Sequence, residues 1–165
     1  LSLGLLHFIG TEFMPKLDEG NLWITISLPP ASSLEFSKDV ERSVRQVLRS
    51  YPVRLGLNPE GHKEQEGDFR TPEGVYSIAS RNARSEYFLS LKVSYPSDDD
   101  RESARRRGVA PGGNIMIHGL PNVPRRPLSY YRDIDWTNGC IAVNNDDMLE
   151  IWLLTRNRVP VEIRP

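Results

Sequence analysis

Glycine and proline interrupt this chain so often that no long helix or long strand fits into most of it. The sequence holds 12 glycines and 13 prolines among 165 residues, and both residue types are concentrated in turns. The apolar segments between them are short, and several alternate apolar with polar residues, which is typical of half-buried strands. We therefore expect a fold that is mainly β with a few helices.

Charge and composition exclude several classes of function. Lys and Arg number 21 and Asp and Glu 22, so the net charge of -1 gives no electrostatic reason to expect a nucleic-acid partner. No apolar run reaches the 18 or so residues that a membrane-spanning helix requires, so we expect no membrane span in this chain. The single cysteine excludes an internal disulfide and a metal site built from several cysteines.

The first 50 residues differ in pattern from the rest. Trp23–Leu28 is a predicted strand, and Pro29 ends it because proline cannot donate to a β-ladder. Apolar residues then recur at helical spacing, which predicts a helix over Leu34–Leu48 that Pro52 stops. We place a boundary here, with residues 1–50 as an appendage of one strand and one helix and residues 51–165 as the main domain.

The main domain is predicted to consist of short strands and two helices. Asp98–Asp100 are expected to cap a short polar helix that includes Arg105–Arg107, and Asn144 or Asn145 is expected to cap a second helix. In the polar loop Glu66–Gly74 we expect Asp68 and Arg70 to form structural hydrogen bonds. The predicted strands are Val53–Leu57, Val75–Ser80, Tyr87–Ser94, Asn114–His118, Cys140–Val143 and Pro160–Arg164.

One cysteine and one histidine stand out as candidates for chemistry. Gly139 precedes Cys140, which lets the backbone approach a substrate and leaves two successive amides that could stabilise an oxyanion. His118 ends a predicted strand and is followed by Gly119. A thiol is mostly protonated at neutral pH, so a nucleophilic cysteine needs such a base, which can hold the pair as thiolate and imidazolium.

Two other interpretations of these residues remain. A free cysteine is among the most buried residue types, so Cys140 can be an inert core residue, and His118 a satisfied core histidine. A metal site would need Cys140, His118 and Asp135 without a second cysteine, which is a poor ligand set. We therefore expect no metal.

Residues from about 51 to 165 resemble the L,D-transpeptidase family of cell-wall enzymes, specifically a branch with the signature Asp-Trp-Thr-x-Gly-Cys. The signature itself reads Asp135-Trp136-Thr137-x-Gly139-Cys140-Ile141-Ala142-Val143 here. Further matches are Leu55-Gly56-x-Asn58-Pro59-x-Gly61-His62-Lys63, Glu66-Gly67-Asp68-x-Arg70-Thr71-Pro72-Glu73-Gly74-x-Tyr76, Ser94-Tyr95-Pro96, and Pro111-Gly112-Gly113-x-Ile115-x-Ile117-His118-Gly119.

The resemblance implies a cysteine acyltransferase with an L,D-transpeptidase-like β-sandwich fold and no cofactor. Cys140 would attack the carbonyl of meso-diaminopimelate in a peptidoglycan stem peptide, releasing D-alanine and forming a thioester that an amine resolves. His118 would act as the base, and the Gly119 carbonyl would orient its ring. The amides of Gly139 and Cys140 would bind the oxyanion.

The resemblance also implies a setting and a set of partners. Trp136, Thr137 and Asn138, from the signature, would contact substrate. The acceptor would be another stem peptide or a cell-wall lipoprotein, and the location would be the periplasm or cell envelope. Ala142 stands where many members have arginine, although the Asp-Trp-Thr branch shares the alanine. With water as acceptor the same site would be a peptidoglycan or lipoprotein-linkage hydrolase, and a third alternative is a catalytically inactive fragment.

The appendage resembles a different family. Residues 8–23 are similar to a segment of heavy-metal efflux pumps of the resistance-nodulation-division family, where it follows a transmembrane helix. The two strands that usually open the L,D-transpeptidase domain are missing from the sequence before Leu55. We interpret the chain as a chimera or a truncated product in which Trp23–Leu28 fills a sheet edge, residues 1–20 are loosely held, and residues 1–50 contribute nothing to catalysis.

Overall fold

The computed structural model describes residues 24–26 and 50–165. The helix predicted over Leu34–Leu48 and the predicted loose attachment of residues 1–20 lie outside these described residues. Everything that follows concerns the described part.

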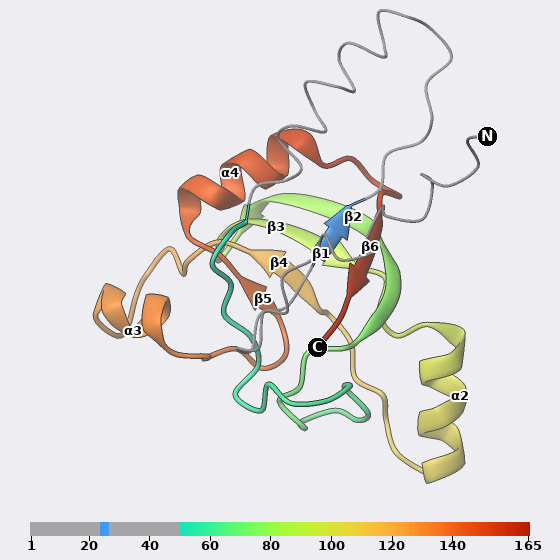
Figure 1. Cartoon of the computed structure of the whole chain (residues 1–165). Helices are drawn as coiled ribbons and strands as arrows, with labels where there is room; N and C mark the ends of the chain where they lie inside the picture. Colours follow the sequence, from blue (N-terminus) through green and yellow to red (C-terminus); the bar gives the residue numbers. More distant parts are fainter. Residues whose placement is uncertain (1–23, 27–49) are drawn as a thin grey trace, which may run out of the picture.

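One curved six-stranded sheet forms the body of the molecule, in the order β1-β6-β2-β3-β4-β5 (Figure 1). Neighbouring strands are antiparallel except β4 and β5, which run parallel. The strands are β1 (Ile24–Ile26), β2 (Gly74–Ser85), β3 (Phe88–Val93), β4 (Met116–His118), β5 (Ile141–Ala142) and β6 (Pro160–Ile163).

The two edges of the sheet are covered differently. At one edge, β1 pairs with β6, with Ile24 opposite Ile163, so the described part of the predicted strand, Ile24–Ile26, fills an edge. At the other edge, Arg54 exchanges backbone hydrogen bonds with Ala142 of β5, and Gly56 bridges to Thr137. The predicted strand Val53–Leu57 is therefore wrong as a continuous strand, because this segment changes partner after two residues.

Three helices lie in the described part: α2 (Asp98–Arg107), α3 (Leu128–Asp133) and α4 (Asn145–Leu154). The cap predicted for α2 was misplaced by one residue, because Ser97 is the N-cap and forms a capping box with Asp100. Asn144 caps α4, as one of the two predicted alternatives. The sequence did not predict α3, whose N-cap is Pro127 and which has no side-chain capping bond.

A single apolar core joins the sheet to α4. Met148 and Ile151 of α4 are buried over β3, and the inward residues of β2 to β6 complete the cluster. Its buried strand residues include Ile78, Leu91, Val93, Ile117, Ile141, Val161 and Ile163. None of the helices described is long and apolar enough to cross a bilayer. The prediction of a mainly β fold with a few helices is confirmed.

Candidate active site

His118 is the last residue of β4, the strand next to the edge strand β5. It pairs with Ser90 of β3 on one side and Ala142 of β5 on the other. The side chain is buried, with Nδ1 at 2.7 Å from the carbonyl oxygen of Gly119. A carbonyl can only accept, so Nδ1 carries the proton, and Nε2 keeps the lone pair that a general base needs. This contact is the one expected for Gly119.

Aromatic rings enclose the imidazole of His118. The Tyr87 ring centroid lies 4.6 Å from it, and the Trp136 ring meets it edge-on at 5.7 Å. Tyr131 in turn packs edge-on against Trp136, at 5.0 Å between centroids. Burial lowers the pKa of His118, and the hydrogen bond to the Gly119 carbonyl opposes this only in part. The ring is therefore held neutral, in one tautomer and one orientation.

The hydroxyl of Thr137 stabilises the turn before Cys140 through two hydrogen bonds. The hydroxyl donates to the carbonyl of Cys140 at 2.7 Å and accepts from the amide of Gly139 at 3.1 Å. The Gly139 amide is therefore engaged within the turn, and Thr137 is buried. Both contacts speak against the oxyanion role predicted for Gly139 and the substrate contact predicted for Thr137. The Cys140 amide has no hydrogen-bond partner in residues 24–26 and 50–165.

Two glycines let three backbone segments meet behind the cysteine. Gly139 has φ of 122°, and a Cβ there would lie 2.5 Å from the carbonyl oxygen of Arg70. A Cβ on Gly56 would collide with the carbonyl oxygen of Phe69. The close approach expected of Gly139 is thus an approach to the protein's own backbone, and it fixes the position of Cys140 directly before β5.

The thiol of Cys140 is half-buried and donates to the carbonyl oxygen of Asn114, at 3.6 Å from Sγ. Burial raises the pKa of Cys140, while a backbone hydrogen bond at Met116 and the charge of Lys63 act in the opposite direction. Together with the lowered pKa of His118, this favours a neutral thiol on Cys140 and a neutral imidazole on His118. The expected resting pair of thiolate and imidazolium is therefore not favoured, and the proton has to move during attack.

We expect alkylation of Cys140 by iodoacetamide to keep accelerating with pH above about 8.5, the ordinary pKa of a cysteine thiol. The reason is that the thiolate reacts, and burial raises the pKa of this thiol. The measurement is the second-order labelling rate from pH 5 to pH 10, with glutathione as the reference thiol. A rate that is already on its plateau at pH 6 would show a resting ion pair and contradict this account.

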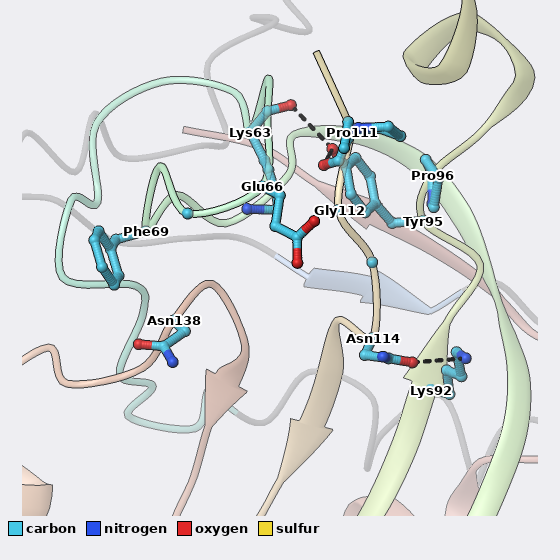
Figure 2. Close-up of a pocket in the computed structure, with 13 residues that line it drawn as sticks. Lys63, Glu66, Phe69, Lys92, Tyr95, Pro96, Pro111, Gly112, Asn114 and Asn138 are labelled. Carbon is cyan, nitrogen blue, oxygen red and sulfur yellow. Dashed lines mark hydrogen bonds between the residues drawn. The ribbon is translucent and has the colours of Figure 1, made fainter. Parts of the chain in front are cut away.

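A cavity of about 660 Å³ lies beside Asn114, the residue whose carbonyl oxygen accepts the hydrogen bond from the thiol (Figure 2). We call it the Asn114 cavity, because Asn114 lines it and also accepts the hydrogen bond from Cys140. Asn138, which is exposed, lines its other side, and its predicted contact with substrate stays a prediction. The remaining lining residues are Lys63, Glu66, Gly67, Phe69, Lys92, Tyr95, Pro96, Ala110, Pro111, Gly112 and Gly113.

Asp68 fixes the loop that forms one wall of the cavity. Its carboxylate accepts from the ammonium of Lys63 at 2.6 Å and from the amides of Glu64, Gln65 and Arg70. Burial alone would raise the pKa of Asp68, but these donors lower it to about 2. The structural role predicted for Asp68 is confirmed, whereas Nε of Arg70 is buried without a hydrogen-bond partner in the described part.

A histidine at a strand end and a Gly-Cys turn thus define the candidate site. A comparison of the sequence with protein families identifies the family. The model of the YkuD family, the L,D-transpeptidase catalytic domain, matches residues 23–163. The chain belongs to this family. The match begins before β1 and therefore includes that strand.

Individual relatives agree with this assignment. Escherichia coli (strain K12) YafK, which is named as an L,D-transpeptidase, is 32% identical over 76 residues, covering 45% of this chain and 29% of YafK. The K307A mutant of Pgp2, a helical cell shape determining protein of Campylobacter jejuni, has a crystal structure that is 28% identical with a TM-score of 0.50. That match covers 66% of this chain and 34% of Pgp2, so the chain spans about a third of each relative.

Sequence reasoning missed several residues of this L,D-transpeptidase site. Tyr87 was assigned only to a strand, although an aromatic residue entering a strand next to that of His118 is a signal for ring packing. Asn114 has φ of 55°, a conformation in which asparagine is enriched, and it follows the turn Pro111–Gly113. That position, directly before a histidine-bearing strand, could have indicated a backbone contact at the site.

Proposed function

We propose that this chain is a cysteine acyltransferase that acts on peptidoglycan stem peptides through a thioester on Cys140. The observation that carries this proposal is the tautomer of His118, whose Nδ1 hydrogen bond to Gly119 leaves Nε2 as a base on the strand beside Cys140. Membership of the L,D-transpeptidase family supports the reaction class, since the geometry alone would suit other acyl transfers.

In the first step His118 takes the thiol proton as sulfur attacks the carbonyl carbon of the substrate. The carbon–sulfur bond forms, and the carbon–nitrogen bond breaks when His118 returns the proton to the leaving amine of D-alanine. Both groups start neutral, so the resting site holds no charge pair. The imidazolium and the oxyanion arise only during the attack. An acceptor amine then repeats the sequence in reverse and leaves an amide.

Three groups are assigned to the substrate. The unpaired amide of Cys140 binds the developing oxyanion, in place of the pair of amides first expected. Trp136 is partly exposed and is assigned to the substrate through its ring, whereas its Nε1 is buried without a hydrogen-bond partner in the described part. Asn138 supplies an exposed amide on the cavity side. Thr137 supports the turn and does not contact substrate.

The setting we propose is the periplasm or cell envelope, with stem peptides as donor and either a stem peptide or a lipoprotein amine as acceptor. The cell-shape role named for Pgp2 supports peptidoglycan as the polymer that is modified. Residues 1–50 are proposed to add no catalytic group, because β1 lies at the edge of the sheet opposite to β5. We interpret the resemblance of residues 8–23 to efflux pumps as a foreign origin of the stretch before the family match, which begins at residue 23.

We expect D-alanine to be released from a tetrapeptide stem, and a new amide to form only when an amine acceptor is added. Mass spectrometry of the products, with and without the amine, measures both. Release of D-alanine with free tripeptide in both samples would assign a hydrolase instead. No release by the folded chain would contradict the proposal. Equal release by a chain lacking residues 1–22 would support the proposal that these residues add no catalytic group.

A further inference from the structure

The Asn114 cavity has one positive and one negative side chain without a neutralising partner. Lys63, also on its wall, is buried and paired with Asp68 at 2.6 Å, so its charge is satisfied. Glu66 forms no ion pair with any of the described residues. Lys92 donates to the side-chain oxygen of Asn114 at 3.0 Å and forms no ion pair within the same part of the chain.

These two charges lie on different walls of the cavity. Figure 2 shows Glu66 extending its carboxylate between the two walls, with Asn138 on one side and the Asn114–Lys92 pair on the other. Lys92 comes from β3 and Glu66 from the loop that Asp68 fixes. An unpaired charge that faces a partly enclosed cavity gains more from an opposite charge there than it would in open water.

Asn114 connects this charge arrangement to the nucleophile. Its side-chain oxygen accepts from Lys92, and its main-chain oxygen accepts from the thiol of Cys140. A ligand group bound at Lys92 would therefore be separated from the Cys140 thiol only by Asn114, which contacts both. The cavity is thus placed to receive a part of the molecule that reacts at Cys140.

We propose that the Asn114 cavity binds a free amino-acid end, with its ammonium on Glu66 and its carboxylate on Lys92. This inference rests on the proposed function, since in a stem peptide of the type proposed the side-chain end of meso-diaminopimelate carries both groups on one carbon. Either the donor or the acceptor stem can supply that end. A cavity of about 660 Å³ has room for an amino-acid end and its alkyl chain.

The binding experiment uses three small probes on the full chain. D-norvaline carries both charges, D-norvalinamide only the ammonium, and N-acetyl-D-norvaline only the carboxylate. Dissociation constants are measured from amide chemical-shift changes at Gly112 and Gly113 of the cavity wall. We expect each capped probe to bind about tenfold more weakly than D-norvaline, because each loses one charge-assisted hydrogen bond.

Two variants assign each charge. Lys92→Met should bind D-norvaline and D-norvalinamide equally, and Glu66→Gln should bind D-norvaline and N-acetyl-D-norvaline equally. Glu64→Gln is the matched control, because Glu64 lies in the same loop but pairs with Arg107 at 2.8 Å and does not line the cavity. It should bind all three probes as the unaltered chain does. Equal affinity of the unaltered chain for all three probes, or no shift at the cavity wall, would overturn the proposal.

A second arm identifies the source of the amino-acid end. A tetrapeptide whose meso-diaminopimelate side-chain amine is acetylated should acylate Cys140 about tenfold more slowly if the cavity holds the donor. If it holds the acceptor, acylation should be unchanged, while capping the carboxylate next to the acceptor amine should slow amide formation. Probe binding does not depend on turnover, so a bound probe without acylation would contradict the proposed function and leave the cavity assignment standing.

Discussion

Replacing His118 with glutamine should slow formation of the acyl-enzyme on Cys140 by about 100-fold to 10,000-fold, the usual contribution of a general base. Glutamine is neutral, as the buried imidazole is, so the burial of position 118 costs no new charge. What disappears is the basic nitrogen that accepts the thiol proton. The measurement is the single-turnover rate of acylation by a tetrapeptide, followed by quenching and mass spectrometry.

His62 provides the matched control for this substitution. It is the other histidine in the described part, and it pairs with Asp100 at 3.1 Å at the base of α2, away from the Cys140 turn. His62→Gln should change the acylation rate by less than about threefold. A His118→Gln variant that acylates at a rate within threefold of the unaltered chain, while remaining folded, would remove His118 from the mechanism.

Replacing Gly139 with alanine should destabilise the fold by about 3 to 5 kcal/mol, which combines the strain of a positive φ with overpacking. The added Cβ would lie 2.5 Å from the carbonyl oxygen of Arg70, and neither backbone can move without displacing the Cys140 turn. Urea denaturation monitored by circular dichroism measures this loss. We also expect the folded fraction to lose acylation, because Cys140 follows directly.

A matched substitution at Gly67 distinguishes the two contributions expected at Gly139, backbone strain and overpacking. It also has a positive φ, of 80°, but a Cβ there would meet nothing within 4 Å. Gly67→Ala should therefore cost only about 1 kcal/mol, from backbone strain alone. Equal losses for the two substitutions would show that the contact with Arg70 does not determine the need for glycine at position 139.

Most of the fold could be predicted because its elements carry local signals. Strands β3 and β6 are short segments with buried apolar residues, and α4 has Asn144 as its cap. Strand β2 was predicted only over Val75–Ser80, and it continues to Ser85 through largely polar residues that carry no such signal. The prediction of a continuous strand over Val53–Leu57 was wrong because the pairing of this segment depends on Ala142 and Thr137, which are distant in sequence. Helix α3 was not predicted because Pro127 provides no capping side chain and most of the helix is exposed.

The site shows the same division between local and non-local information. The sequence could predict that His118 and Cys140 lie at the ends of neighbouring strands, because each has a glycine beside it; His118 ends β4, and Cys140 directly precedes β5. It could not predict that Thr137 would occupy the Gly139 amide, since that depends on how a single turn is folded. The charges of Glu66 and Lys92 come from separate segments that only the sheet brings together. Close approach of Nε2 of His118 to the thiol during attack stays a prediction.

The most direct test of this account is the intact mass of the chain after brief incubation with a stem tetrapeptide and an acid quench. We predict a mass increase equal to the tetrapeptide minus D-alanine, located on Cys140 by peptide mapping and absent in Cys140→Ala. Release of D-alanine at the same rate by Cys140→Ala, with no adduct on the unaltered chain at any quench time, would contradict a thioester mechanism on Cys140.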